Sequence, residues 1–172
     1  MIVLGVDPGT ATTGYGVVAQ AGDGAVSLLE CGVVRTAPGA PLPTRLREIY
    51  EGIIEVVDRT APDIAAVEGV FYGRNVKTTV VLGHARGAIL LAVTLRDLPV
   101  AEYAPAEVKN AIVGTGRATK EQVQYMIQRL LRLRHPPRPA DAADAVAVAL
   151  THCYAGTLAR LREPLRFRVE QG

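Results

Sequence analysis

The sequence predicts an α/β fold with a mixed five-stranded sheet, in which a three-stranded antiparallel meander is extended by parallel strands and helices cover both faces. Two observations carry this prediction. Apolar runs of strand length open the chain, and segments with helical periodicity separate the later strand-like runs. The 172 residues suffice for one domain, and 49% hydrophobic with 21% charged residues excludes a disordered chain.

Three strands are expected at the start of the chain. Residues 2–7 form an apolar run that stops at the turn Asp7-Pro8-Gly9. Residues 13–19 and 26–36 are β-rich runs joined by the turn Gly22-Asp23-Gly24. Because short turns connect consecutive strands, the three should pair as an antiparallel meander.

Helices and strands then alternate. Apolar residues at helical spacing predict an amphipathic helix over 41–60 and a second, more apolar helix over 75–95. A β-rich run follows each helix, at 63–68 and at 99–103. Since a helix precedes each of these strands, they should pair in parallel through right-handed crossovers.

Helices fill the rest of the chain. Pro105 suits the first turn of a short helix that ends near Gly114. The segment Thr119-Lys120-Glu121-Gln122 fits a capping box, which predicts a helix over 120–134 that ends at a group of prolines. A last helix covers 140–161. We assign residues 1–156 to one domain and residues 157–172 to a basic C-terminal tail.

Composition narrows the function classes. No uninterrupted apolar run approaches the roughly 18 residues of a membrane helix, and the first one contains Asp7 and lacks a basic flank, so we expect neither a membrane partner nor a signal peptide. Cys31 and Cys153 lack disulfide-framework or metal spacing, which indicates reduced thiols and a cytoplasmic protein.

The net charge of +2 is unevenly distributed. Residues 1–102 carry 8 Lys/Arg and 11 Asp/Glu, a net of −3, whereas residues 103–172 carry 11 and 6, a net of +5. A basic half can bind a phosphate backbone, although a solvated surface explains it equally well.

Two acids end strands that should be neighbours. Asp7 ends the first strand and Glu68 ends the fourth, and ligand sites in open α/β sheets lie beyond the carboxyl ends of parallel strands. Asp7 is also explained as a turn residue before Pro8. Glu68 is harder to explain structurally, because it stands alone in an apolar run where an unpaired carboxylate is costly.

Two more acids lie three residues apart near the start of the last helix. This spacing places Asp141 and Asp144 on one helical face. The helix dipole alone favours acids there. However, the flanking residues are alanine and valine, and no Lys or Arg follows at i+4, so the pair should need another cation. His152, two turns beyond Asp144, is the only histidine placed to support these acids.

Four carboxylates without a cysteine or a histidine pair form a hard oxygen site. Such a site prefers Mg²⁺, with Mn²⁺ as a substitute, over Zn²⁺. Two such ions roughly 3.5–4 Å apart can activate water and stabilise the leaving oxygen in phosphoryl chemistry. We therefore expect two Mg²⁺ ions per site.

Five segments resemble the RuvC family of Holliday-junction resolvases, within the ribonuclease-H-like superfamily. They are Asp7-Pro-Gly-Thr, Val67-Glu68-Gly-Val-Phe71, Tyr103-Ala-Pro-Ala-Glu-Val-Lys109, Gly114-Thr-Gly-Arg-Ala-Thr-Lys120-Glu-Gln-Val and Ala140-Asp141-Ala-Ala-Asp144-Ala. The resemblance covers residues 1–155 and implies a ribonuclease-H-like nuclease domain. It further implies a homodimer that cuts four-way DNA junctions symmetrically with Mg²⁺, and a partnership with the RuvA–RuvB branch-migration motor. Residue by residue, it implies that Asp7, Glu68, Asp141 and Asp144 are the metal-binding catalytic acids.

The expected DNA contacts are mostly basic. Lys120 lies in a first helical turn, where the dipole disfavours a cation but backbone N–H groups favour an anion, so a phosphate would explain it. Arg117 and Lys109 could join it, and the resemblance implies DNA contact for Lys109 and Lys120. Three solvated cations are the alternative.

A loop after Glu68 supplies further candidates. Phe71 either closes the loop as a core anchor or stacks on bases at the junction, and the resemblance favours stacking. Arg74 in the same loop could contact the DNA backbone. The small and apolar residues of the helix over 75–95 suit a two-fold subunit interface, which the resemblance also implies, although a buried helix in a monomer remains an alternative.

Two other function classes compete with the nuclease. The first is suggested by Val6-Asp7-Pro8-Gly9-Thr10, which is similar to the first phosphate loop of sugar kinases and actin-like ATPases. Those proteins need two such domains, whereas the length of this chain allows one. Since Gly114-Thr115-Gly116 also falls short of a nucleotide loop, we expect no nucleotide cofactor. The second alternative is a junction-binding module without catalysis. It would leave four acids facing the negatively charged DNA without a metal, which is electrostatically unfavourable.

Overall fold

The sheet has the mixed topology that the sequence predicts. The computed structural model describes residues 1–69 and 76–162. Its five strands lie in the order β3-β2-β1-β4-β5, with β1, β2 and β3 antiparallel and β1, β4 and β5 parallel. The strands are β1 (Ile2–Asp7), β2 (Thr12–Gln20), β3 (Val26–Arg35), β4 (Ile64–Glu68) and β5 (Val100–Tyr103).

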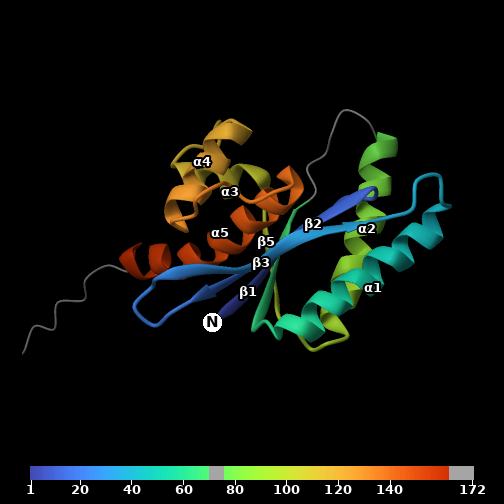
Figure 1. The fold of residues 1–172 in the computed structure, drawn as a ribbon, viewed down its shortest axis with the longest axis horizontal. Coiled ribbons are helices and arrows are strands. Elements are labelled where there is room, and N and C mark those ends of the chain that lie inside the picture. The colour runs from blue at the N-terminus through green and yellow to red at the C-terminus, as the bar shows by residue number, and fades with distance from the viewer. Residues whose placement is uncertain (70–75, 163–172) are drawn as a thin grey trace, which may run out of the picture.

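Helices cover both faces of this sheet, which confirms the predicted fold class (Figure 1). One hydrophobic core lies between the sheet and the first two helices, and a second lies between the sheet and the last three. The helices are α1 (Leu42–Thr60), α2 (Val76–Thr94), α3 (Pro105–Val113), α4 (Lys120–Leu130) and α5 (Ala140–Arg162).

One helix boundary was wrong in the prediction. α4 ends at Leu130, whereas the capping box and the prolines predicted a helix to residue 134. The backbone leaves the helix at Leu131, with ψ near 1°, and Arg132 has a left-handed φ of 52°. The N–H group of Leu133 then donates to the carbonyl of Gln128. The chain therefore turns before it reaches the prolines.

α5 packs directly on the backbone of the central strands. A Cβ atom added to Gly5 of β1 would lie 2.1 Å from the carbonyl oxygen of Ala145, and one added to Gly14 of β2 would lie 2.0 Å from that of Asp141. These separations exclude any side chain. The glycines therefore let the first turns of α5 approach the strands closely, next to the end of β1.

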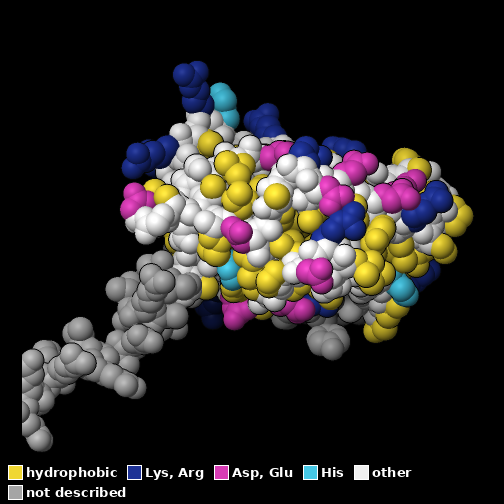
Figure 2. Space-filling view, turned by 90° about the horizontal axis from the view of Figure 1, so that it is seen from below, with side chains coloured by type: hydrophobic (Ala, Val, Ile, Leu, Met, Phe, Trp, Pro, Cys, Tyr) yellow, Lys and Arg dark blue, Asp and Glu magenta, His cyan; other side chains and the backbone are white. Residues whose placement is uncertain are grey.

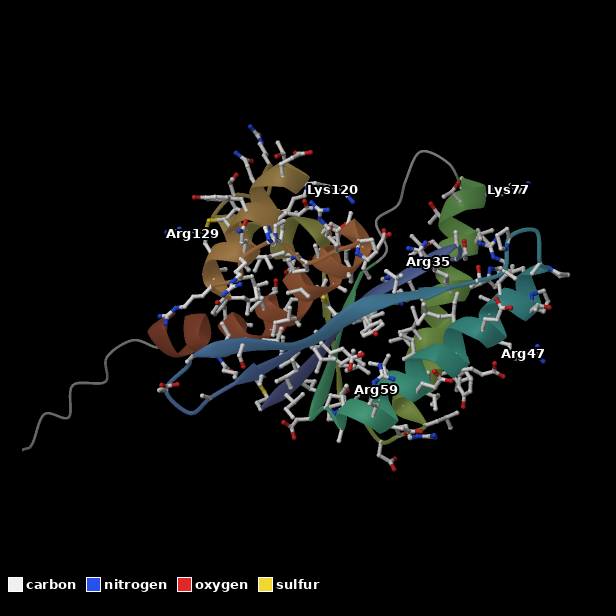
Figure 3. All side chains as sticks on the ribbon, in the orientation of Figure 1. Arg35, Arg47, Arg59, Lys77, Lys120 and Arg129 are labelled. Carbon is white, nitrogen blue, oxygen red and sulfur yellow. The ribbon has the colours of Figure 1, made fainter. Side chains whose placement is uncertain are left out.

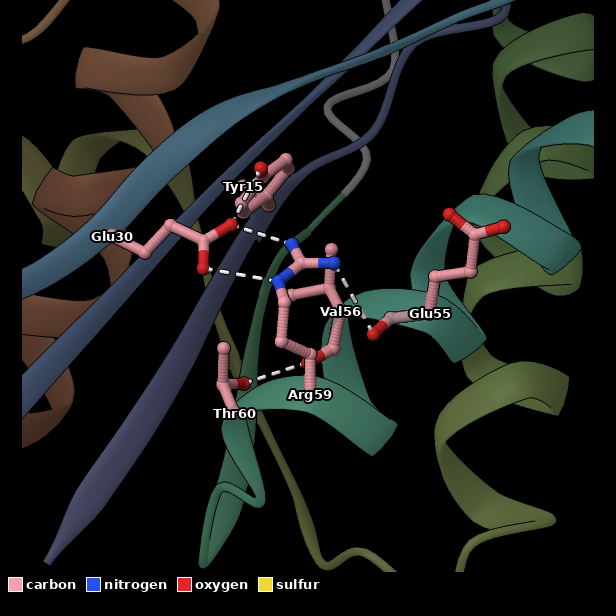
Figure 4. Close-up of polar contacts among 6 residues, drawn as sticks. All are labelled: Tyr15, Glu30, Glu55, Val56, Arg59 and Thr60. Carbon is pink, nitrogen blue, oxygen red and sulfur yellow. Dashed lines mark hydrogen bonds and ion pairs between the residues drawn. The ribbon is translucent and has the colours of Figure 1, made fainter.

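α1 is fastened to the meander by a polar cluster (Figure 4). The guanidinium of Arg59 donates to both carboxylate oxygens of Glu30, and the Tyr15 hydroxyl donates to the same carboxylate at 2.9 Å. Arg59 lowers the pKa of Glu30, because the ion pair favours the charged form. Arg59 therefore has a structural role, in the contact between α1 and β3.

α2 departs from the expectation that no segment could span a membrane. By length and mean hydropathy it is the one helix in the described residues that could do so. The count of uninterrupted apolar runs missed it, because isolated polar residues break the sequence without lowering its average hydropathy much. Ala85, Ile89, Ala92 and Val93 of this helix are nonetheless buried in the core under the sheet.

Candidate active site

The first two acids meet where β1 and β4 end. These strands pair in parallel, with Val6 beside Val67, so Asp7 and Glu68 follow on adjacent strand ends. Their carboxyl groups share a hydrogen bond. The sequence-based prediction that the two acids would share one crevice is therefore realised in the structure.

Asp7 and Glu68 do not readily carry two full negative charges, because both carboxyl groups are largely buried and lie side by side. Burial raises the pKa of Asp7 to about 8, and the charge of Glu68 and then of Asp144 adds to the effect. Burial also raises the pKa of Glu68, and this is partly opposed by its hydrogen bond with Asp7 and by the nearby lysines. Without a bound cation, the pair therefore retains a proton near neutral pH.

The other acids come from the first turns of α5. Asp144 accepts a hydrogen bond from the Lys120 ammonium, with 2.7 Å between Lys120 Nζ and Asp144 Oδ2. Thr119 caps α4, since its hydroxyl accepts from the Gln122 N–H group, and this fixes Lys120 in the first turn. Asp141 lies one turn earlier on α5, close enough for its charge to raise the pKa of Asp7.

These elements enclose a cavity of about 260 Å³. Three acids and two lysines supply its polar groups, and apolar side chains of α3, α4 and α5 form the rest of its wall. The lining residues are Asp7, Glu68, Pro105, Val108, Lys109, Lys120, Val123, Asp144 and Ala147. The structure thus brings together five of the nine site residues that the sequence suggested.

The other four candidates lie off the cavity wall or outside the described residues. Asp141 is adjacent to the cavity but does not line it. Arg117 is exposed in the loop before α4 and also lies off the cavity wall. Phe71 and Arg74 lie outside the described residues.

Two contacts were missed from the sequence. Asp144 pairs with Lys120, which is 24 residues away and belongs to another helix. The Nδ1 atom of His152 lies 2.8 Å from the Tyr103 hydroxyl on β5. Spacing along the chain carries no signal for either contact, since both depend on how helices pack on the sheet.

Comparison with known proteins identifies the family. The family model for the crossover junction endodeoxyribonuclease RuvC matches residues 3–152. The chain belongs to the RuvC family. This excludes the kinase-like and actin-like reading of the first loop, and the nuclease fold expectation is confirmed.

Relatives in the RuvC family resemble nearly the whole chain. A RuvC from Moorella thermoacetica is 52% identical over 153 residues, which cover 88% of this chain and 90% of that protein. One from Pelotomaculum thermopropionicum is 47% identical over 154 residues, covering 90% and 93%.

Solved structures agree. Thermus thermophilus RuvC in complex with a Holliday junction substrate is 40% identical with a TM-score of 0.86, covering 92% of this chain and 96% of that one. The yeast mitochondrial Holliday junction resolvase Ydc2, at 12% identity and a TM-score of 0.63 over 92% of this chain and 85% of that one, shares the fold.

The donor set of this RuvC-family site fits a hard divalent cation. Asp7, Glu68 and Asp144 line one cavity with Asp141 beside it, and burial, together with the charges of the other three acids, raises the pKa of Asp7. Within residues 1–69 and 76–162 no three acidic, cysteine or histidine side chains converge on one point. The acids instead divide into the proton-sharing pair Asp7–Glu68 and the pair Lys120–Asp144, two arrangements that balance charge without a metal.

Proposed function

We propose that this chain is a Mg²⁺-dependent crossover junction endodeoxyribonuclease that resolves four-way DNA junctions in recombination and repair. The observation that carries the proposal is the single cavity that holds Asp7, Glu68 and Asp144 beside Lys109 and Lys120. Acids that can hold a metal and lysines that can hold a phosphate are the two requirements of metal-assisted phosphodiester hydrolysis. The family match of residues 3–152 supports the junction as the substrate.

The metal would be held by the four acids. Asp7, Glu68, Asp141 and Asp144 supply only carboxylate oxygens, which suit two Mg²⁺ ions, with Mn²⁺ as a substitute. When bound, Mg²⁺ polarises the phosphodiester and lowers the pKa of water. Asp141, beside the cavity, orients the attacking water or accepts its proton, and the products are a 5′-phosphate and a 3′-hydroxyl.

The basic residues would bind the DNA strand. Lys109 of α3 and Lys120 of α4 lie on the cavity wall, where their ammonium groups can contact oxygens of the scissile phosphate. Arg117 precedes α4 and would contact a neighbouring phosphate. Phe71 would stack on a base at the branch point and Arg74 would contact the backbone beside it.

A homodimer would cut two strands at symmetric positions. One face of α2 exposes large apolar side chains toward its two ends, including Leu91 and the adjoining Leu95 at 53% and 57% exposure, and Gly83 and Gly87 lie in its middle. Figure 2 shows hydrophobic side chains at the surface both in the middle of the face seen from below and toward the end at the right. Two copies of α2 packed across a dyad would cover this stripe and point two sites at a two-fold junction.

The cellular setting follows from the same proposal. Cys31 and Cys153 are free thiols in the structure, which suits a reducing cytoplasm. The RuvA–RuvB branch-migration complex would deliver the junction to the dimer.

An experiment with matched substrates tests the function. The chain is incubated in Mg²⁺ with an immobile four-way junction and with linear duplex, beside an Asp7→Asn variant. We expect paired, ligatable nicks in the junction alone, and none with the variant or in EDTA. Equal cutting of linear duplex would refute junction specificity, and junction binding without any cutting in Mg²⁺ would reduce the chain to a binding module.

A further inference from the structure

The connection between α4 and α5 carries a dense positive charge. From residue 122 to residue 140 the chain has four arginines and one histidine but no acidic residue. All five side chains are exposed. We call this set the arginine surface; its members are Arg129, Arg132, Arg134, His135 and Arg138.

The arginines of this surface differ from most of those on the helices that cover the opposite face of the sheet. In the described part of the chain, Arg47, Arg59, Arg86 and Arg96 of α1, α2 and the turn after α2 each pair with a carboxylate. None of the arginines between α4 and α5 has such a partner among those residues. Figure 3 shows Arg129 and Lys120 at opposite ends of α4, with Arg47 and Arg59 across the sheet on α1.

The segment that presents these arginines is held in shape. The Gln128 side chain donates to the carbonyls of Leu133 and Arg134, and the Leu133 N–H group donates back to Gln128. Leu131 and Pro137 are buried beneath it. An unpaired cation cluster on a fixed backbone is suited to an extended anionic partner, because little backbone order must be gained on binding.

Its position relates it to the candidate active site. Lys120 lines the cavity at the first turn of α4, and Arg129 lies near the last turn, about 14 Å further along at 1.5 Å per residue. Arg138 lies three residues before Asp141 on the return to α5. At 3.4 Å per base pair, the surface extends over roughly four base pairs of B-form DNA from the cavity.

We propose that the arginine surface binds the sugar–phosphate backbone of one duplex arm of the junction, roughly four to five base pairs from the cut. This inference rests on the proposed function and adds to it a second contact, which would hold the arm while the scissile phosphate occupies the cavity. The contact is to phosphates, so it is independent of base sequence and sensitive to salt.

Salt-dependent binding tests this contact. Affinity for an immobile junction is measured in EDTA from 50 to 300 mM KCl, for the wild type, for R132Q/R134Q and for the matched control R47Q/R96Q, which also loses two positive charges. For every phosphate that the protein no longer neutralises, the slope of log affinity against log salt should fall in magnitude by about 0.9. We expect a reduction of about 2 in R132Q/R134Q and none in the control.

Arm length provides a second readout. Wild-type affinity should rise when the arms are lengthened from four to ten base pairs, and R132Q/R134Q should gain less. If R132Q/R134Q keeps the wild-type slope and arm-length dependence while the wild type binds and cuts the junction, this inference alone is overturned. If the wild type itself does not bind the junction, the proposed function fails and this inference fails with it.

Discussion

The Lys120 ammonium lies 2.7 Å from a carboxylate oxygen of Asp144, so the first turn of α4 supplies the positive charge that the first turns of α5 lack. Asp144 is 19% exposed and Lys120 is 66% exposed. Asp144 raises the pKa of Lys120 through the hydrogen bond, which keeps the ammonium charged. In the metal-free protein this lysine balances a carboxylate that the proposed metal would otherwise balance.

Removing this lysine should make the protein more dependent on metal. Lys120→Met leaves Asp144 without its partner, and we expect a loss of about 1–3 kcal/mol of stability in EDTA. Added Mg²⁺ should then raise the melting temperature more than it does for the wild type, because the ion replaces the missing charge. Thermal unfolding with and without Mg²⁺ measures both effects.

Lys109→Met is the matched control for that experiment. Lys109 lines the same cavity but makes no ion pair with a carboxylate in the described residues. Its removal should leave the metal-free melting temperature and the Mg²⁺ shift near their wild-type values. Equal shifts in the two variants would show that the pair with Asp144 has no special role.

The acid pair predicts how stability depends on pH. Asp7 has a folded pKa of about 8 against an ordinary 3.8, so the folded state binds more protons than the unfolded state between these values. The free energy of unfolding in EDTA should therefore fall as the pH rises from about 4 to about 8. Asp7→Asn should flatten this decline and be more stable than the wild type at pH 8. Urea unfolding at pH 5, 6.5 and 8 measures both, and a parallel decline in the two proteins would contradict the prediction.

Gly14 should control the position of the α5 acids. A Cβ atom there would lie 2.0 Å from the carbonyl oxygen of Asp141, so Gly14→Ala must displace the start of α5. We expect about 1–3 kcal/mol of destabilisation and a loss of junction cutting at temperatures where the variant stays folded. Gly22→Ala is the control, because nothing lies within 4 Å of its added Cβ atom. Circular dichroism and a cleavage assay separate loss of fold from loss of geometry.

The apolar stripe of α2 should hold the dimer. Leu91→Glu/Leu95→Glu places charges on side chains that are half exposed in the single chain, so the fold should persist while self-association is lost. Light scattering should give a monomer for this variant and a dimer for the wild type. Tyr125→Glu on α4, 60% exposed in the wild type, should leave the dimer intact.

The sequence was sufficient for the order and pairing of the strands, because apolar runs, turn residues and intervening helices are local signals. It also predicted that Asp7 and Glu68 lie close together, because neighbouring parallel strands end at the same edge of the sheet. The end of α4 was missed, because Leu131 and Arg132 turn the chain through tertiary packing rather than through a breaker residue. The pairing of Lys120 with Asp144 was missed for the same reason, as it joins two helices 24 residues apart.

The contact of α5 with the glycines of β1 and β2 has a consequence for how the family can vary. Main chain touches main chain at Gly5 and Gly14, so the spacing between the Asp7 strand and the α5 acids is fixed by atoms that every amino acid shares. Any residue with a Cβ atom at position 5 or 14 would therefore push α5, and with it the second pair of acids, away from Asp7.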